Sequence, residues 1–152
     1  MNELTDADIE RFSRQLLLSS FSEALQQKLF QTAVSTPVEL PSAAAYLTAA
    51  GLRHLQIEIT ADEQLQAAEA LREHLQALDP ESRITIGKQP TAWGLKCTAD
   101  GLALVTPTET VLIAAGPKTA LGPAIDRLQL GTRGAMAIIH SIAMNQQAHC
   151  PV

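Results

Sequence analysis

The sequence holds 152 residues, with eleven Lys and Arg against sixteen Asp and Glu and a formal net charge of -5. This length suits one globular domain, which buries roughly two thirds of the surface of its unfolded chain. The acidic balance and the lack of any basic run longer than two residues argue against a nucleic-acid partner. Every apolar stretch ends before the roughly 20 residues that a bilayer-spanning helix needs, so no membrane partner is expected.

The cysteines and the N-terminus indicate a cytoplasmic protein. Cys97 and Cys150 lie far apart and neither belongs to a Cys-x-x-Cys pair, so a disulfide framework is not expected. The chain opens with Asn2, Glu3 and Asp6, where a secretory signal would carry basic residues.

The first thirty residues read as a helical segment. Thr5 and Asp8 form a possible capping box for a helix over 6–18, and the apolar residues of this stretch recur at helical spacing: Leu4, Ile9, Phe12 and Leu16. A second short helix is expected over 23–29.

From residue 31 the pattern changes to alternating strands and helices. "TAVSTPVELP" has β-favouring residues and two prolines, and "SAAAYLTAAG" predicts a helix over 42–50 that ends at Gly51. "LRHLQIEIT" alternates Leu55, Ile57 and Ile59 and predicts a strand.

The next helix has the strongest signal in the chain. Thr60 and Glu63 fit a capping box, and a helical stripe of apolar residues then runs to the Asp79-Pro80 stop. Strands are predicted over 83–86, 102–105 and 109–115. The segment 87–101, around Trp93, gives no clear pattern.

The chain closes with helical sequence. Residues 117–130 predict a broken helix, and "GAMAIIHSIAMNQ" predicts a last helix with one apolar face. The whole pattern predicts a single α/β domain over 1–152, a Rossmann-like three-layer fold with a mainly parallel sheet. It divides into an N-terminal helical segment (1–30), the sheet and its helices (31–147) and a tail (148–152).

The opening run "LTDADIERFSRQLLLSSF" resembles the N-terminal signature of the ThiF/MoeB/HesA adenylyltransferases, relatives of the ubiquitin-activating enzymes. That signature carries Arg-(Tyr/Phe)-x-Arg-Gln, and Arg11, Phe12, Arg14 and Gln15 stand at those places. Three later blocks resemble the family in the same order: "AAAYLTAAGLRHLQI", "AAEALREHLQALDPESRI" and "RGAMAIIHSIA". The resemblance implies a Rossmann-like fold, dimers and ATP-dependent adenylyl transfer.

The sequence departs from the family where ATP phosphates would bind. The family has a turn of the form G-x-G-G-x-G after its first strand, because backbone amides must approach the phosphates closely. Here that place reads "STPVELP", and no glycine lies between Lys28 and Ala50. Glu39 adds negative charge and two prolines remove amide donors. We therefore expect no phosphate cradle of this kind, and neither ATP nor magnesium as a cofactor.

Other nucleotide-facing features of the family are also missing from the sequence. Ile59 and Thr60 stand where the family has acidic residues, and only residues 60–65 replace its crossover of roughly 15 to 20 residues. In place of a metal-binding Asp after the fourth strand, "VTPTET" offers Thr108 and Glu109. Paired zinc-binding cysteines are absent as well.

Arg14 is the candidate functional residue that the resemblance supplies, with Arg11 and Gln15 in support. In dimers of the family, the second arginine of the signature reaches the nucleotide of the partner subunit, where a cation neutralises phosphate charge. Arg14 is thereby a possible in-trans arginine. The alternative is a solvated face or a surface salt bridge of this arginine pair, with Asp8 or Glu10.

The other chemical groups favour structural roles. The four histidines, His54, His74, His140 and His149, show no spacing that closes a metal site, so no metal is expected. Cys97 has Lys96 as its one sign of activation and is interpreted as a thiol on a strand edge. The spacing of Glu109 and Asp126 does not show whether they form a pair of catalytic carboxylates. The "TPTET" stretch is expected to line the C-terminal crevice of the sheet, where a small neutral ligand stays possible.

The function expected from the sequence is protein–protein interaction without intrinsic catalysis. The partner would be a second copy or a ThiF/MoeB-like subunit, bound through the N-terminal helix and the alanine-rich helix 42–50. The alternative for that helix is that its alanines pack on the chain's own sheet. The alternatives are a subunit that supplies Arg14 to an active partner, and independent adenylyl transfer by this chain.

Overall fold

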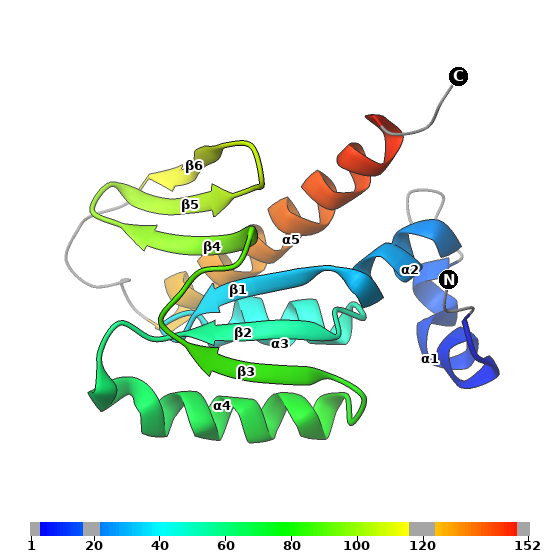
Figure 1. The fold of residues 1–152 in the computed structure, drawn as a ribbon, viewed down its shortest axis with the longest axis horizontal. Helices are drawn as coiled ribbons and strands as arrows, with labels where there is room; N and C mark the ends of the chain where they lie inside the picture. The colour runs from blue at the N-terminus through cyan, green and yellow to red at the C-terminus, as the bar shows by residue number, and fades with distance from the viewer. Residues whose placement is uncertain (1–3, 17–21, 116–123, 149–152) are drawn as a thin grey trace.

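The computed structural model describes residues 4–16, 22–115 and 124–148 and shows a six-stranded sheet flanked by helices (Figure 1). The strand order is β3-β2-β1-β4-β5-β6. The neighbours from β3 to β4 pair in parallel, and β4, β5 and β6 pair antiparallel. The α/β class, the mainly parallel sheet and the N-terminal helical segment predicted from the sequence are confirmed.

Two helices precede the sheet, α1 (Asp6–Leu16) and α2 (Glu23–Gln31). The capping box of α1 forms as predicted: the Asp8 N–H donates to Thr5 Oγ1 at 3.2 Å, and the Thr5 N–H donates to Asp8 Oδ2 at 3.1 Å. Ser22 caps α2 by accepting the Leu25 N–H at 3.1 Å. The predicted end of the first helix falls in residues 17–21, outside the described part of the chain.

The parallel half of the sheet is a β-α-β-α-β unit. Its elements are β1 (Ala33–Pro37), α3 (Pro41–Ala49), β2 (His54–Glu58), a single 3-10 turn (Asp62–Gln64), α4 (Leu65–Leu78) and β3 (Arg83–Gly87). Gly51 follows α3 with a φ of 106°, a left-handed conformation that favours glycine. It lets the chain turn sharply from the end of α3 toward β2.

The second half is an antiparallel meander followed by one long helix. Its elements are β4 (Trp93–Thr98), β5 (Gly101–Val105), β6 (Thr110–Ala115) and α5 (Ala124–Ala148). β4 lies in the segment 87–101, whose residues show no clear pattern. α5 is continuous from Ala124, whereas the sequence predicted a broken helix and a separate last one; residues 116–123 lie outside the described part. In the part that the structure describes, no helix is both long and apolar enough to cross a bilayer.

The two halves of the sheet meet along a short boundary between β1 and β4. β1 pairs with β2 at five positions but with β4 at two, Val34 with Trp93 and Ser35 with Gly94. The Val38 N–H donates to β2, at Glu58 O, so by the alternation of backbone groups Pro37 faces β4. Proline has no N–H to donate, and the pairing of β4 with β1 has already ended before this residue.

Helices cover one face of the sheet, and a loop crosses the other. α3, α4 and α5 all contribute to the core on the face of Leu55 and Ile57. Residues 88–92, which join β3 to β4, pass over the opposite face, in front of β1 in Figure 1. There the Thr91 N–H donates to Ser35 Oγ at 3.4 Å, and Gln56 Nε2 donates to the Gln89 carbonyl. The predicted third layer of helices is therefore not found on this face in the part of the chain that the structure describes, where a loop of five residues stands instead.

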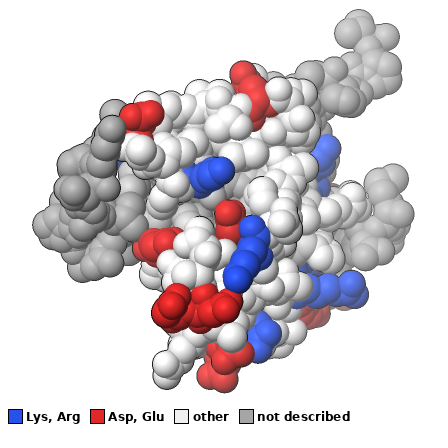
Figure 2. Space-filling model, turned by 60° about the vertical axis from the view of Figure 1, so that its left-hand side comes forward, with Lys and Arg blue, Asp and Glu red and all other residues white. Residues whose placement is uncertain are grey.

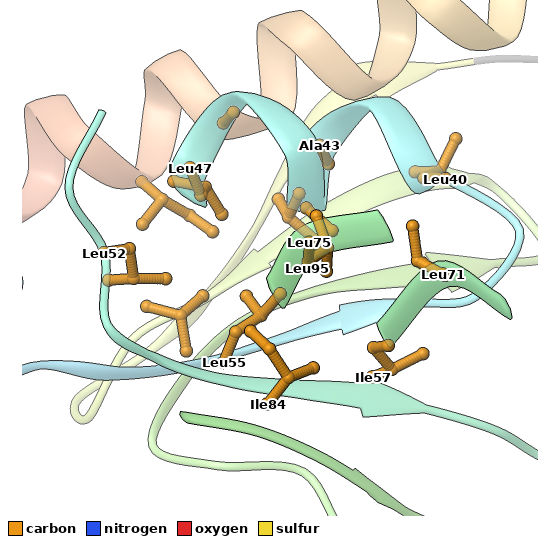
Figure 3. Close-up of a cluster of buried hydrophobic side chains, with 14 of the residues drawn as sticks. Leu40, Ala43, Leu47, Leu52, Leu55, Ile57, Leu71, Leu75, Ile84 and Leu95 are labelled. Carbon is orange, nitrogen blue, oxygen red and sulfur yellow. The ribbon is translucent and has the colours of Figure 1, made fainter. Parts of the chain in front are cut away.

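The core lies between the sheet and these helices (Figure 3). Leucine and isoleucine fill it, which agrees with an aromatic content of 3%. A fully buried side chain of this size stabilises the fold by about 1.5–3 kcal/mol relative to an exposed one. The largest fully buried side chains in the parallel half include Leu40, Leu47, Leu52, Leu55, Ile57 and Leu75.

Candidate functional site

The C-terminal ends of β1 and β2 are where an open α/β sheet of this kind binds ligands, so the turn after β1 is the first candidate site. The amides of Val38, Leu40 and Ala43 are each hydrogen bonded to a main-chain carbonyl group, at 3.0–3.1 Å. Pro37 and Pro41 have no N–H to offer. These five positions therefore present no amide to a phosphate group.

Helix α5 covers the first turn of α3. A Cβ added to Gly131 would lie 1.9 Å from Ser42 Oγ and 2.9 Å from the backbone nitrogen of Ala43. The two helices thus meet with their backbones nearly in contact, at the end of α3 whose amides and dipole would otherwise attract an anion.

The alanines of α3 are used inside the chain. Ala43 and Ala44 are fully buried in the core that α3 forms with the sheet and α5. Of the two interpretations of the alanine-rich helix, packing within the chain is therefore the one found for these residues. Tyr46 and Ala49, on the other side of α3, are exposed.

Two carboxylates stand at this edge of the sheet. Burial raises the pKa of Glu58, the charge of Glu39 raises it further, and Lys96 opposes the shift. Glu39 also accepts a hydrogen bond from Gln64 Nε2 at 2.8 Å. Figure 2, which brings this side of the molecule forward, shows acidic and basic side chains interspersed with no extended basic area. A phosphorylated ligand would meet negative charge at the turn.

The link between β2 and α4 is capped differently from the prediction. Gln64 Oε1 accepts the N–H groups of Thr60 and Ala61, at 2.7 and 3.4 Å. The predicted capping box of Thr60 with Glu63 is therefore wrong, because a 3-10 turn (Asp62–Gln64) precedes α4 and brings Gln64 back over the start of the link. Glu63 is exposed.

Cys97 has the environment of an inert thiol. Burial raises its pKa to about 11, and the charges of Glu39 and Glu58 add to the shift. The thiolate is the nucleophilic form, so this environment opposes reactivity. β4 lies between β1 and β5, but it pairs with β1 at Trp93 and Gly94 only, so Cys97 pairs with β5 and has no strand partner on its β1 side, as expected for a thiol on a strand edge. Lys96, taken as a sign of activation, acts instead on the Glu58 carboxylate.

The "TPTET" stretch lies at the opposite end of the sheet from the expected crevice. It joins β5 to β6, and because β5 runs antiparallel to β4, this turn lies near the level where the parallel strands begin (Figure 1). The comparison of Thr108 and Glu109 with a metal-binding Asp was therefore wrong. The turn after β4, the fourth strand, contains Asp100, whose N–H donates to Thr98 Oγ1 at 3.3 Å. This turn could have been located in the sequence if the strand over 93–98 had been recognised.

Arg11 joins α1 to the end of α4. Its Nη1 lies 3.0 Å from Asp79 Oδ1, and its Nη2 donates to the Leu78 carbonyl at 2.8 Å. The predicted surface pairing with Asp8 or Glu10 is wrong for Arg11. Asp8 instead pairs with Arg53, with 2.5 Å between Oδ1 and Nη2.

Of the other predicted site residues, the structure describes the side chains of only some. Arg14 and Gln15 lie in α1, but their side chains fall outside the described ones, as do those of Asp126, His149 and Cys150. His74 and His140 are exposed on different helices. Among the residues that the structure describes, no three or more His, Cys, Asp or Glu side chains are grouped as a metal site.

Comparisons with known proteins find likeness in structure alone. No protein-family profile and no curated protein matches the sequence. Among solved structures, TcdA (CsdL) is 18% identical with a TM-score of 0.48, and the match covers 60% of this chain and 43% of that one. The E. coli tRNA N6-threonylcarbamoyladenosine dehydratase TcdA, in complex with AMP, is 17% identical with a TM-score of 0.48, covering 60% and 45%.

The matched part is therefore less than half of either neighbour. Both neighbours belong to the ThiF/MoeB family that the opening residues resemble. A likeness at this TM-score carries no functional argument, so the function of this chain has to be argued from its own residues.

Proposed function

We propose that this chain is a cytoplasmic, ThiF/MoeB/HesA-like protein that does not bind ATP and acts by protein–protein interaction. The observation that carries the proposal is the contact of Gly131 with the first turn of α3. Phosphate binding at a helix N-terminus requires free amides that can approach the anion. Here a second helix lies against that end.

Two further observations support the loss of nucleotide binding. The amides of Val38 and Leu40 are engaged by carbonyl groups, so a phosphate would have to displace these bonds. Glu39 and Glu58 stand beside the turn, and their charges would oppose a polyphosphate. Catalysis of adenylyl transfer depends on fixed donors at the phosphates, so the same features argue against intrinsic activity.

Calorimetric titration with Mg-ATP tests this proposal. We expect no binding heat up to millimolar nucleotide, and micromolar binding would overturn the proposal. The double variant Glu39→Gln/Glu58→Gln separates the two causes, since it removes the charges and leaves the backbone bonds in place. We expect this variant to give no binding heat either. Binding by the variant but not by wild type would mean that the negative charges, and not the engaged amides, exclude ATP.

The interaction surface that we propose lies on the outer side of α3 and α5. Tyr46, Met136 and Met144 are 40%, 50% and 51% exposed, and the Tyr46 hydroxyl lies 3.2 Å from the Met136 sulfur. Exposed aromatic and Met side chains are enriched at protein interfaces. The first partner to test is a second copy of this chain, and the next is a ThiF/MoeB-like subunit.

Light scattering coupled to size exclusion measures the homodimer directly. The variant Tyr46→Ser/Met136→Ser should shift the chain to monomer, whereas Leu65→Ser, which removes an exposed side chain from α4, should not. A wild-type chain that is monomeric at high concentration would rule out the homodimer and leave the heterodimer with a ThiF/MoeB-like subunit. Equal dimerisation of both variants would place the interface elsewhere.

A second candidate function is the supply of Arg14 to an active ThiF/MoeB-type subunit. The observation that favours it is the firm attachment of α1, through the ion pairs of Asp8 with Arg53 and Arg11 with Asp79. Arg14 lies in the same helix, so its backbone is held by these contacts. Arg14→Ala should then lower the adenylation rate of the partner without changing assembly, and Arg133→Ala on α5 is the control. An unchanged rate with Arg14→Ala would refute this role.

A further inference from the structure

A pocket of about 470 Å³ lies at the end of the sheet where the parallel strands begin, away from the turn after β1. This volume is within the range of small-molecule sites. The C-terminal half of α2 and the first residues of β2 and β3 form its wall. The lining residues are Gln27, Phe30, Gln31, Arg53, His54, Glu81 and Arg83.

Arg53 lines this pocket and is held in place by several contacts. Its guanidinium carbon lies 3.8 Å from the centre of the Phe30 ring, and its Nη2 contacts Asp8. Its Nε lies 4.0 Å from Asp79 Oδ2, and Asp79 is paired with Arg11. The two arginines and the two buried aspartates therefore cancel one another in charge. Arg53 shapes the pocket but contributes little net charge to it.

Two further charged groups line the pocket, an acid that is itself paired with Arg53 and a base. Glu81 is 69% exposed and lies 3.1 Å from Arg53 Nη2; its N–H donates to Asp79 Oδ1 at 3.1 Å, which fixes its place after α4. Arg83 is exposed on β3 and lies beside His54, its register partner on β2. Side chains of register partners stand next to each other on one face of the sheet.

The remaining polar lining comes from α2. Gln27 and Gln31 are four residues apart and so share one face of the helix. Each amide carries donors and an acceptor, so it can satisfy either end of a polar ligand. The apolar part of the lining is the ring of Phe30, which is 8% exposed and stacks against the Arg53 guanidinium.

We propose that this pocket binds a small zwitterion of the α-amino-acid type. The carboxylate of the ligand accepts hydrogen bonds from the Arg83 guanidinium and the His54 ring. Its ammonium group donates to the Glu81 carboxylate and to an amide oxygen of Gln27 or Gln31. A plain anion would leave Glu81 opposing it, and a plain cation would leave Arg83 opposing it; a ligand with both charges satisfies the two ends.

Calorimetry and thermal-shift measurements on the full chain test the proposal, with the common L-amino acids as probes, each added singly. For any amino acid that binds, two analogues are then measured. The 2-hydroxy acid keeps the carboxylate and lacks the ammonium group, whereas the amino-acid amide keeps the ammonium group and lacks the carboxylate. Each should bind at least about tenfold more weakly, since each loses a charge-assisted hydrogen bond.

Charge-matched variants locate the site. Arg83→Gln and Glu81→Gln should each weaken binding of the amino acid at least about tenfold. Glu81→Gln should leave binding of the 2-hydroxy acid no weaker than in wild type. Arg133→Gln and Glu73→Gln remove the same charges from exposed positions on α5 and α4 and should leave binding unchanged. Circular dichroism verifies that the variants fold. The proposal fails if no amino acid binds, if the 2-hydroxy acid binds as tightly, or if the control variants weaken binding equally.

Discussion

Replacing Gly131 by Ala tests the contact that covers the first turn of α3. The added Cβ would meet the backbone nitrogen of Ala43 at 2.9 Å and Ser42 Oγ at 1.9 Å. The hydroxyl of Ser42 can rotate, but the backbone of α3 cannot move without shifting the helix. Overpacking of this kind destabilises a fold by about 1–3 kcal/mol, against a gain of about 1 kcal/mol from Gly to Ala in a helix interior.

Gly134→Ala is the matched control on the same helix. Its Cβ would meet the side-chain ends of Leu95 and Leu102, at 2.7 and 3.1 Å, and these can adjust by rotation. Both variants gain the same helix propensity, so their difference compares a contact with backbone with a contact with two buried leucine side chains. We expect Gly131→Ala to be less stable than Gly134→Ala by about 1 kcal/mol. Urea unfolding followed by circular dichroism measures it, and equal or reversed stabilities would refute the packing described for α3 and α5.

Three further outcomes follow from the described contacts. Burial raises the pKa of Asp8, but hydrogen bonds from Thr5 and Arg53 lower it below the ordinary 3.8. The ionised carboxylate therefore stabilises the fold above about pH 4, and this contribution is lost on further acidification. The free energy of unfolding of Asp8→Asn should depend less on pH in that range than that of wild type. With Cys150 replaced by Ser, Cys97 should react with iodoacetamide far more slowly at pH 8 in the native protein than in urea, because its pKa is raised to about 11; equal rates would contradict its burial. Thr36 Oγ1 is buried and has no hydrogen-bond partner among the residues that the structure describes. The free energy of unfolding of Thr36→Val in urea should therefore equal that of wild type or exceed it by up to about 1 kcal/mol, whereas a loss of stability would mean that the hydroxyl has a partner.

The elements with strong periodicity were predictable from the sequence, and the missed ones have physical reasons. α4 has a full apolar stripe, and β2 alternates cleanly between buried and half-buried residues. β4 was missed because it follows β3 after a link of five residues, too short for the helix that usually joins parallel strands. Two helices were predicted where α5 is one, but Gly131 and Gly134, which lie where the two would meet, allow α5 to pack closely and do not interrupt it.

The candidate site was less predictable, because its contacts join residues far apart in the chain. Arg11 donates to the Leu78 carbonyl, 67 residues away, and local spacing offered only Asp8 and Glu10. The turn after β1 was correctly located by its prolines and Glu39, but its cover by α5 depends on a helix from the other end of the sequence. Asp100 was missed together with β4, since the place of a turn in a sheet depends on which strand precedes it.

The short boundary between β1 and β4 has a consequence for how the molecule opens. Residues 33–87 pair among themselves along five positions per strand, and residues 93–115 do the same, while Val34/Trp93 and Ser35/Gly94 alone join the two groups within the sheet. Outside the sheet, the close contact of α3 with α5 joins the two groups of residues. Proteins open in cooperative units with free energies below that of global unfolding. Native-state hydrogen exchange should therefore reveal two such units, with the amides of this boundary exchanging before those of β2.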